Sequence, residues 1–374
     1  MRVDKSKWKP LFFGDICCVS NGKSQKQVED ANGAYPIYGS GGLMGYASEY
    51  LCEAETTIIG RKGTINKPIF VKERFWNIDT AFGLYPKNIK DEMTTKYLFY
   101  LCNSIDFTSI QSGAAIPSLT KRDIQKLELL LPSISEQRAI TEELDGIQSL
   151  IAKCREQLED YDRLARSIFH EMFGDPVKNE KGWKTIQMKA CVLQMHIGPF
   201  GSALKSDCFV KEEDSYCMVY EQKHAIKKTL AQETHFVSKD KYEELKRFEV
   251  VSGDIIVSCR GTIGEVWELP DNAPLGIIHP SLMKIRTNSQ TINKAFFLWI
   301  LRGLVSRSDT KGACVQMAIK ARDLEKKVIP LPPLPLQQQF ASRIEAIEEM
   351  KEATKAQLAD LQQLFDSRMQ YYFS

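Results

Sequence analysis

The chain has 374 residues, of which 43% are hydrophobic and 26% charged, and its formal net charge is +2. This length suits two or three domains with separate cores, and neither composition nor charge indicates a disordered or strongly basic protein. The first ten residues lack the apolar core of a signal peptide, and the most apolar stretch, residues 295–305, is too short to span a bilayer. We therefore expect a cytoplasmic protein that does not enter a membrane.

Residues 1–133 are expected to form a first globular domain that mixes helices and strands. The runs TTIIG (Thr56–Gly60) and KPIFV (Lys67–Val71) are short, β-branched and bounded by Gly or Pro, which predicts strands. The run YGSGGLMGY (Tyr38–Tyr46) predicts a glycine-rich loop. Residues 91–104 place apolar side chains on one face at helical spacing, which predicts a helix.

Residues 134–173 are expected to form a long helix with a heptad seam. Its apolar residues recur in alternating steps of four and three: they are Ile140, Leu144, Ile147, Ile151, Cys154, Leu158, Tyr161, Ala165, Ile168 and Met172. Such a helix is about 55 Å long and exposes an apolar stripe when it is alone. Gly174 and Pro176 end it.

Residues 174–335 and 336–374 repeat this organisation as a second globular domain and a second long helix. The second domain has a predicted strand at GDIIVSC (Gly253–Cys259) and a predicted helix at residues 293–304. The second seam is less apolar, and its residues are Phe340, Ile344, Ile347, Lys351, Thr354, Leu358, Leu361, Phe365, Arg368 and Tyr372. We expect the two helices to bury their seams on each other in an antiparallel coiled coil; packing of each helix on its own domain is the alternative.

The two halves are related by an internal repeat with an offset close to 200. Residues 119–140 align with residues 319–340, and Ser167 and Phe173 match Ser367 and Phe373. The fold class is therefore α+β, with two similar globular domains, two long helices and pseudo-twofold symmetry. The net charge is +3 for residues 1–133 and +5 for 174–335, but −4 for 134–173 and −2 for 336–374, so a polyanion would favour the globular parts.

No catalytic, metal or cofactor site is indicated. NGKS (Asn21–Ser24) lacks the earlier glycine of a phosphate-binding loop, because Cys17 occupies that position. The ten cysteines include no CxxC pair and the five histidines supply no zinc spacing, so we expect scattered buried thiols in a reducing compartment. No GxGxxG, HExxH or GxSxG motif is present, and no catalytic constellation is apparent.

Several polar motifs are candidates for contact with DNA. RKGT (Arg61–Thr64) and CRGT (Cys259–Thr262) each place a basic residue beside glycine after a strand. Such a side chain can bind guanine or phosphate; a solvated turn is the alternative. GPFGSALK supplies Ser and Lys that could bind phosphate oxygens; an ordinary strand–turn connection is the alternative. YEQKH contains a Gln that could pair with adenine; a polar strand end is the alternative. The predicted contacts are Lys23, Tyr38, Ser40, Arg61, Lys62 and Thr64 in the first copy and Ser202, Lys205, Tyr220, Gln222, Lys223, Arg260 and Thr262 in the second.

Taken in order, these motifs resemble the specificity subunit of type I restriction–modification enzymes over essentially the whole chain. The resemblance rests on IGPFGSALKSDCFV, GDIIVSCRGTIGEV and HPSLMKIR in the second copy. In the first copy it rests on YPIYGSGGLMGY, IIGRKGTI, FWNIDTAFGLYP and IPSLTKRDIQKLELLLPSISEQRAI. No single motif is diagnostic, but the same ordered set occurs twice.

The resemblance implies that each globular domain is a target recognition domain for one half of an asymmetric, bipartite site in double-stranded DNA. It implies that the paired helices space these domains and dock two methyltransferase subunits, which motor–nuclease subunits join for cleavage. The specificity subunit would itself be non-catalytic and hold no cofactor. Two alternatives are a methyltransferase or nuclease with an unrecognised site, and a structural adaptor that does not bind DNA.

Overall fold

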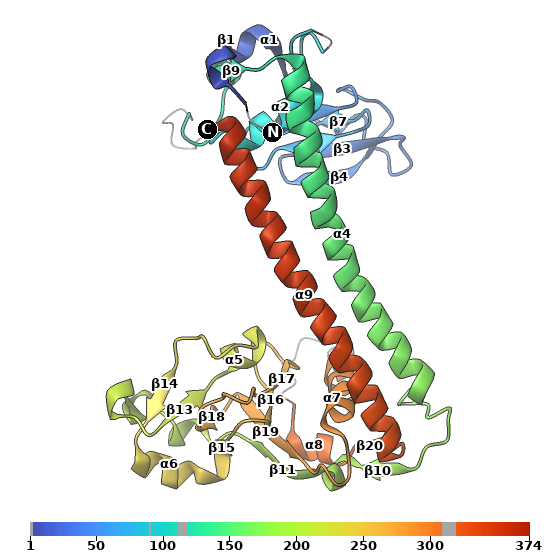
Figure 1. The fold of residues 1–374 in the computed structure, drawn as a ribbon, viewed down its shortest axis with the longest axis vertical. Coiled ribbons are helices and arrows are strands. Elements are labelled where there is room, and N and C mark those ends of the chain that lie inside the picture. The colour runs from blue at the N-terminus through green and yellow to red at the C-terminus, as the bar shows by residue number, and fades with distance from the viewer. Residues whose placement is uncertain (1–2, 90, 111–117, 309–318) are drawn as a thin grey trace. The chain divides into compact units, whose positions relative to one another are not determined.

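The computed structural model describes residues 3–89, 91–110, 118–308 and 319–374 (Figure 1). The chain divides into two compact units: unit 1 contains Met1–Leu158 and Ala353–Ser374, and unit 2 contains Glu159–Glu352. The boundary crosses both long helices, so each unit combines a globular part with a segment of each helix. The four consecutive segments predicted from the sequence, 1–133, 134–173, 174–335 and 336–374, stay a prediction.

The described residues of unit 1 form three small sheets. The order β2-β8-β5-β6 is antiparallel throughout; β3 pairs antiparallel with β4 and parallel with β7; and β1 pairs with β9. The strands are β1 (Lys9–Phe12), β2 (Cys17–Asn21), β3 (Tyr35–Gly39), β4 (Gly42–Ala47), β5 (Thr56–Gly60), β6 (Ile69–Val71), β7 (Trp76–Asn77), β8 (Ala81–Pro86) and β9 (Glu128–Leu131). The helices are α1 (Phe13–Ile16), α2 (Thr95–Ser104), α3 (Lys121–Gln125), and parts of α4 (Ile134–Phe173) and α9 (Leu334–Phe373).

The prediction of a glycine-rich loop at residues 38–46 was wrong. These residues form most of the β3–β4 hairpin, in which Gly39 pairs with Gly42 across a two-residue turn. Gly42 has φ +116°, a backbone conformation that favours glycine. A glycine-rich segment can still form paired strands, because sheet hydrogen bonds use backbone groups and do not require large side chains.

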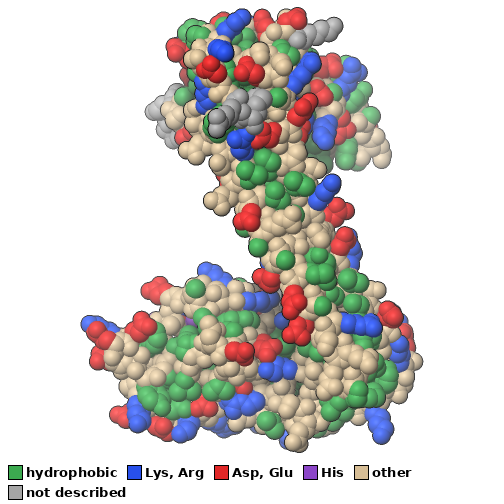
Figure 2. All heavy atoms as spheres, in the orientation of Figure 1, with side chains coloured by type: hydrophobic (Ala, Val, Ile, Leu, Met, Phe, Trp, Pro, Cys, Tyr) green, Lys and Arg blue, Asp and Glu red, His purple; other side chains and the backbone are tan. Residues whose placement is uncertain are grey.

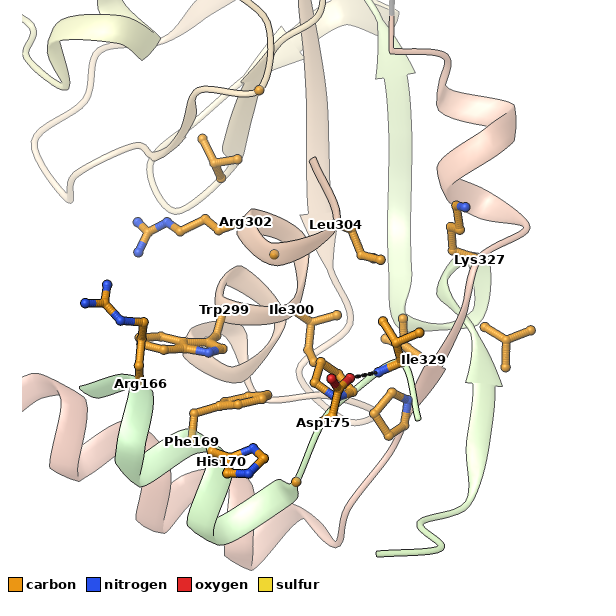
Figure 3. A pocket seen from close by; sticks show the side chains of 18 of the residues that line it. Arg166, Phe169, His170, Asp175, Trp299, Ile300, Arg302, Leu304, Lys327 and Ile329 are labelled. Atoms are coloured by element: carbon orange, nitrogen blue, oxygen red, sulfur yellow. Dashed lines mark hydrogen bonds between the residues drawn. The ribbon is translucent and has the colours of Figure 1, made fainter. Parts of the chain in front are cut away.

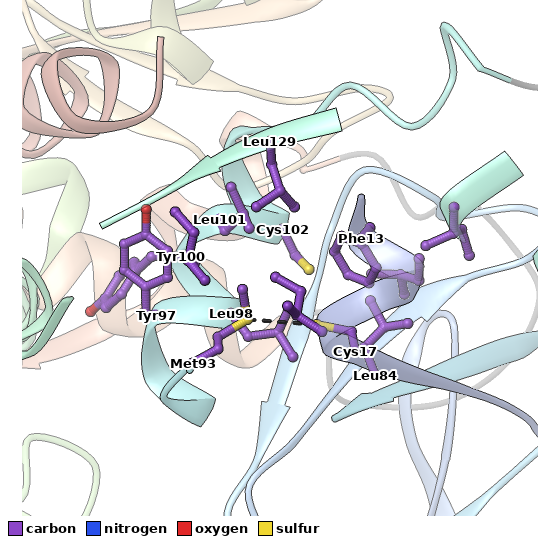
Figure 4. Packing of buried hydrophobic residues seen from close by; sticks show 14 of the residues in the cluster. Phe13, Cys17, Leu84, Met93, Tyr97, Leu98, Tyr100, Leu101, Cys102 and Leu129 are labelled. Carbon is purple, nitrogen blue, oxygen red and sulfur yellow. Dashed lines mark hydrogen bonds between the residues drawn. The ribbon is translucent and has the colours of Figure 1, made fainter. Parts of the chain in front are cut away.

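The core of unit 1 joins α2 to the sheet and to both long helices. The apolar face of α2 is buried, with Tyr97 and Leu98 fully inaccessible, and it packs with Phe13, Cys17 and Leu84 (Figure 4). The same cluster contains residues of α4 and α9, namely Ile140, Leu144 and Tyr372. The end of α9 is thus a structural part of the first globular domain.

The described residues of unit 2 repeat this plan with additions. The order β11-β19-β16-β17 corresponds to β2-β8-β5-β6, the parallel pair β13 and β18 corresponds to β3 and β7, and β10 pairs with β20 as β1 does with β9. Strand β14 pairs antiparallel with β13 as β4 does with β3, and β12 and β15 enlarge this sheet from three strands to five. The bounds are β10 (Thr185–Gln187), β11 (Val192–Ile197), β12 (Phe209–Val210), β13 (Cys217–Tyr220), β14 (His235–Val237), β15 (Glu249–Val250), β16 (Ile255–Ser258), β17 (Val266–Glu268), β18 (Gly276–Ile278), β19 (Leu282–Thr287), β20 (Val328–Pro330), α5 (Gln222–Lys227), α6 (Lys239–Leu245), α7 (Lys294–Ser308) and α8 (Ala321–Glu325).

The core of unit 2 contains a cluster of aromatic rings where α7 meets both long helices. Phe173 of α4 packs edge-on against Phe296 of α7 and Phe340 of α9, with ring centroids 4.8 and 5.4 Å away. Edge-to-face pairs of this kind add stability beyond the area that they bury. Helices α4 and α9 therefore share one core with α7, as they do with α2 in unit 1.

The two long helices run antiparallel within each unit, and their heptad seams are buried or half-buried at every predicted position. In unit 2, Lys351 of α9 forms an ion pair with Asp162 of α4, at 2.6 Å. In unit 1, Arg368 and Tyr372 of α9 both hydrogen-bond to Glu143 of α4. The polar seam residues thus have partners on the facing helix. Although partial burial would raise the pKa of Glu143, these bonds contribute to lowering it to about 2.

A buried glutamine attaches each globular part to the start of a long helix. The side-chain oxygen of Gln137 accepts from the Thr94 amide at 2.9 Å, and its nitrogen donates to the carbonyls of Glu92 (2.7 Å) and Pro132 (3.0 Å). Gln337 repeats this pattern with the Asn293 amide and the Pro332 carbonyl, at 2.8 and 2.7 Å. The repeat of Gln at an offset of 200 therefore has a structural cause.

We expect Gln137→Ala to destabilise unit 1 by about 2–4 kcal/mol, because one buried and two partly buried backbone groups lose their partner and a void remains. Urea unfolding followed by circular dichroism measures this loss. Gln148, exposed on the same helix, is the matched control: Gln148→Ala should change stability by less than about 0.5 kcal/mol. Equal effects of the two substitutions would show that Gln137 has no special role.

Candidate nucleic-acid interface

In unit 1 the loops that follow β2, β3, β5 and β7 converge at one edge. The Ile78 amide donates to the Tyr38 carbonyl at 3.0 Å, and the Arg61 amide donates to the Thr80 carbonyl at 2.8 Å. Gly22 lies so close to this segment that a Cβ atom would overlap the carbonyl of Ile78. Backbone contacts therefore bring together segments that lie far apart in the sequence.

Most predicted contacts of the first copy stand on these converging loops. Lys23 follows β2, Ser40 follows β3, and Arg61, Lys62 and Thr64 follow β5. The three basic side chains are exposed, and none of them forms an ion pair with a described residue. Tyr38, also predicted, is half-buried against the edge of the Phe75 ring. The three basic side chains therefore stand on two of the converging loops, after β2 and after β5, and Ser40 stands on a third.

Unit 2 has the same convergence after β11, β13, β16 and β18. The His279 amide donates to the Tyr220 carbonyl and the Cys259 amide to the Ser281 carbonyl, both at 2.8 Å. A Cβ atom on Gly198 would overlap the carbonyl of His279, as on Gly22 in unit 1. Four loops of unit 2 therefore meet at the edge that corresponds to the one in unit 1.

The turns after β5 and β16 are equivalent, and the backbone shows which residues correspond. The Leu119 amide donates to the carbonyl of Arg61 at 3.0 Å, and the Ile319 amide to the carbonyl of Cys259 at 3.3 Å. Lys62 in unit 1 is consequently the counterpart of Arg260 in unit 2. The next residue in each turn is a glycine with positive φ, +75° at Gly63 and +68° at Gly261. Threonine follows each glycine, at Thr64 and Thr262.

The prediction that Tyr220 contacts DNA is corrected by the structure. Its side chain is fully buried, and its hydroxyl donates to the Pro274 carbonyl at 2.7 Å. Burial raises the pKa of this hydroxyl above its ordinary value. Tyr220 is the last residue of a central strand whose four side chains are all buried, and alternation cannot reveal such a strand.

The residues after Tyr220 form a polar group at the start of α5. Glu221 pairs with Lys223 at 2.9 Å and with His235 at 3.1 Å. Burial would raise the pKa of Glu221, but the hydrogen bonds and charges of its partners, Lys223 first, lower it overall. Lys223 is therefore neutralised in part by its neighbour. Gln222 is occupied as well, because its amide nitrogen donates to the carbonyls of Arg260 (2.6 Å) and Thr262 (2.8 Å).

The remaining predicted contacts of the second copy, Ser202 and Lys205, are exposed on the loop after β11. The sequence analysis considered only polar residues on this loop and missed its most exposed large apolar side chain. Phe200 is 88% exposed and stands between Gly198 and Gly201. The sequence did contain a signal for this exposure. Phe200 stands between Pro199 and Gly201, which are typical of a loop and not of a buried strand or helix.

Known proteins share the sequence pattern and the fold of this chain. The family model for the type I restriction modification DNA specificity domain matches residues 5–160 and 204–363. The chain belongs to this family. Its relatives include a putative type I restriction enzyme specificity subunit of Haemophilus influenzae, 22% identical over 98% of this chain and 94% of that protein. The type I restriction enzyme MjaVIII specificity subunit of Methanocaldococcus jannaschii is 24% identical over 94% and 89%, respectively.

Solved structures show the same fold. The S subunit of a type I restriction–modification system from M. genitalium superposes with a TM-score of 0.62 at 15% identity, covering 100% of this chain and 98% of that one. A chain from a structure of type I system assembly and conformational transition also gives 0.62, at 17% identity, covering 98% and 97%. This chain is accordingly a non-catalytic, DNA-recognising specificity subunit of a type I system.

In the described ranges, no cluster of three or more His, Cys, Asp or Glu side chains is arranged to hold a metal ion. The helices of the same ranges include none that is long and apolar enough to cross a membrane.

A groove of about 820 Å³ lies in unit 2 beside the end of α4, α7 and β20 (Figure 3). Its wall is apolar at Phe169, Trp299 and Ile329, while Arg166 and Arg302 extend to one side; its described lining residues include no serine, threonine or cysteine. A smaller cavity of about 330 Å³ lies beside α2, β9 and the end of α9 in unit 1. We assign neither cavity a chemical role.

We expect Gly198→Ala to destabilise unit 2 by roughly 1–3 kcal/mol, because the new methyl group must displace the backbone of His279. Gly201→Ala, three residues away in the same loop, is the control: a Cβ atom there meets nothing within 4 Å. Thermal unfolding of both variants, compared with the unchanged protein, measures the difference. If both variants unfolded at the same temperature, the expectation that Gly198 lies against the backbone of His279 would be wrong.

Proposed function

We propose that each unit reads one half of an asymmetric, bipartite site in double-stranded DNA, using its converging loops. In this proposal the chain assembles in the cytoplasm with two methyltransferase subunits and with motor–nuclease subunits. The observation that carries it is the occurrence, in both units, of an exposed basic turn at the same sheet edge. Two similar readers in one chain suit a target that has two separate parts.

The chemistry of the turns supports contact with base edges and phosphates. A guanidinium group can donate two parallel hydrogen bonds to guanine in the major groove, whereas an ammonium group is a compact charge suited to phosphate. Arg260 is therefore assigned to a base in one half-site, and its counterpart Lys62 to the backbone of the other. Lys23, Arg61, Ser202 and Lys205 would provide further phosphate contacts, which set register without reading sequence.

Phe200 adds an apolar contact in unit 2. Apolar side chains inserted between base steps partly unstack and bend DNA, and aromatic rings also stack on exposed bases. Phe200 stands on the loop after β11, and the loop is held against His279 by the close approach at Gly198. We therefore assign Phe200 to contact with bases of the second half-site.

Docking of two identical partners is supported by a repeated apolar feature of the long helices. Leu150 and Leu364 are exposed in unit 1, and Leu164 and Met350 are exposed in unit 2. Each occupies the heptad position just before a seam residue, so each pair flanks the buried seam. Hydrophobic side chains also reach the surface along the helices in Figure 2. Two equivalent apolar pairs in one chain would bind the same element of two methyltransferase subunits.

We expect Arg260→Ala to weaken binding of the assembled complex to its DNA site by roughly 1–3 kcal/mol, with specificity relaxed at one position. Lys62→Ala should weaken binding equally on all sequences and make the salt dependence shallower by about one unit. Binding to duplexes altered one base pair at a time, over a range of salt concentrations, separates the two effects. The site itself is obtained by mapping methylated adenines in the host genome.

Lys153→Ala, an exposed lysine on α4, is the control and should leave both quantities unchanged. Binding by the unchanged complex that shows no dependence on sequence would refute the proposed function. Loss of specificity in both half-sites from either single substitution would refute the assignment of one half-site to each unit.

We expect Leu150→Asp with Leu364→Asp to remove one of two bound methyltransferase subunits, and Leu164→Asp with Met350→Asp to remove the other. A charge at the centre of an apolar contact weakens binding by at least about tenfold. Native mass spectrometry of the mixed subunits counts the bound copies. Ser149→Asp with Gln363→Asp, exposed positions that point away from the seam, should leave two copies bound. Retention of both copies by all variants would contradict this docking surface.

A further inference from the structure

We propose that Gln222 is a positioning residue that holds the Arg260–Thr262 turn in the shape needed to read DNA, and is not itself a base-reading residue. This inference rests on the proposed function. Its basis is the pair of hydrogen bonds by which the side chain of Gln222 spans the backbone of that turn. Substitution of Gln222 should therefore affect recognition only through Arg260.

The orientation of the Gln222 amide follows from its two partners. Its side-chain nitrogen lies 2.6 Å from the carbonyl oxygen of Arg260 and 2.8 Å from that of Thr262. Carbonyl oxygens only accept hydrogen bonds, so the nitrogen of the amide must face both of them. The side chain thus closes a bridge across the turn, with one amide hydrogen directed to each side.

This bridge is incompatible with the role that the sequence indicated for Gln222. Bidentate pairing with adenine requires the amide to donate one hydrogen to the base and to accept another through its oxygen. Both amide hydrogens of Gln222 are already used within the protein. Reading of adenine would break at least one of these bonds and release one side of the turn.

The residue between the two carbonyls shows how closely the bridge fits. Gly261 has φ +68°, and a Cβ atom there would lie 3.3 Å from both polar atoms of the Gln222 amide. The base of the loop is closed separately, because the Gly264 amide donates to the Ser258 carbonyl at 2.9 Å. Without Gln222, the loop would keep the hydrogen bond between Gly264 and Ser258, but its tip would lose the two hydrogen bonds from the Gln222 side chain.

Gln222 is itself held by a rigid neighbourhood. The preceding Tyr220 is buried and anchored through its hydroxyl to Pro274. The Glu221 amide donates to the imidazole of His224 at 2.9 Å, and His224 is fully buried. The first turn of α5 is therefore a fixed base from which the Gln222 side chain reaches the neighbouring loop. A support of this kind reduces the freedom that Arg260 would lose on binding DNA.

Unit 1 supports its equivalent turn differently. Ser40 occupies the place after β3 that Gln222 occupies after β13, and its side chain packs beneath Gly60 and Gly63. A serine is too short to span two carbonyls across the turn. The bridge is therefore specific to unit 2, and its loss should affect one half-site only.

The test uses the complete complex with methyltransferase subunits and duplexes that carry the mapped DNA site. We expect Gln222→Met, which has a similar length but no donor, to lower discrimination about tenfold at the base pair where Arg260→Ala loses it. Discrimination in the other half-site and the salt dependence should not change. In the Arg260→Ala background, Gln222→Met should have no further effect, because the two residues act through one contact.

Gln222→Glu separates hydrogen bonding from charge. It also lacks donors and should lose discrimination as Gln222→Met does, with an additional loss of affinity on all sequences from its negative charge. Gln232→Met is the control, since the Gln232 amide bonds only to the adjacent Ala231 carbonyl among described residues. Thermal unfolding verifies that all variants are folded.

The inference is overturned if Gln222→Met discriminates like the unchanged complex, or if its effect adds fully to that of Arg260→Ala. A loss seen with Gln222→Glu alone would also overturn it, because charge would then be the cause. If the unchanged complex fails to discriminate any base pair, the proposed function fails instead. If only Arg260→Ala loses discrimination, the proposed function stands and the bridge has no role in it.

Discussion

The rest of the structure depends on burial of the heptad seams of α4 and α9. A helix of 40 residues with a continuous apolar stripe is unstable in water unless that stripe is covered. In both units the cover comes from the other helix and from the adjoining globular core, where Tyr372 and Phe173 are fully enclosed. Each unit therefore contains segments that are distant in sequence, and each globular part needs both helices to complete its core. The polar seam residues Lys351 and Arg368 fit because carboxylates of the facing helix meet them.

The second constraint is the close approach of strand ends at one edge of each unit. Backbone hydrogen bonds hold the loops together, and Gly22 and Gly198 leave no room for a side chain at the crossing points. Side chains carried by these loops are thereby placed with little freedom of their own. An interface that is ordered before binding loses less entropy when it binds. In the proposed function, this order would let exposed Lys and Arg residues on short loops act as specific contacts.

The two units share this frame but carry different side chains on it. Lys62 and Arg260 occupy equivalent positions but differ in the geometry of their hydrogen-bond donors. Ser40 and Gln222 occupy equivalent places beneath these turns but support them to different extents. Phe200 has no aromatic counterpart among Lys23, Ser24 and Gln25 after β2. In the proposed function, these differences between the loops would let two similar domains recognise different half-sites.

The sequence by itself determined the features that depend on local periodicity and on repetition. Steps of four and three residues specify a helix with one apolar face, so α4 and α9 were predictable, as were the strand TTIIG and the glycine turns after β5 and β16. The repeat at an offset of 200 also indicated two related domains. Family resemblance then connected these features to DNA recognition, and the family comparison agrees.

Only the tertiary structure decided which side chains are available for contact, because burial depends on pairing between strands that are distant in sequence. Tyr220 and Gln222 are two residues apart in one polar motif, yet the first is enclosed by neighbouring strands and the second bridges a turn almost 40 residues away. The same dependence hid the hairpin at residues 38–46 and the exposure of Phe200. Hydrophobic spacing records which face of an element is covered, but it does not record which segment covers it.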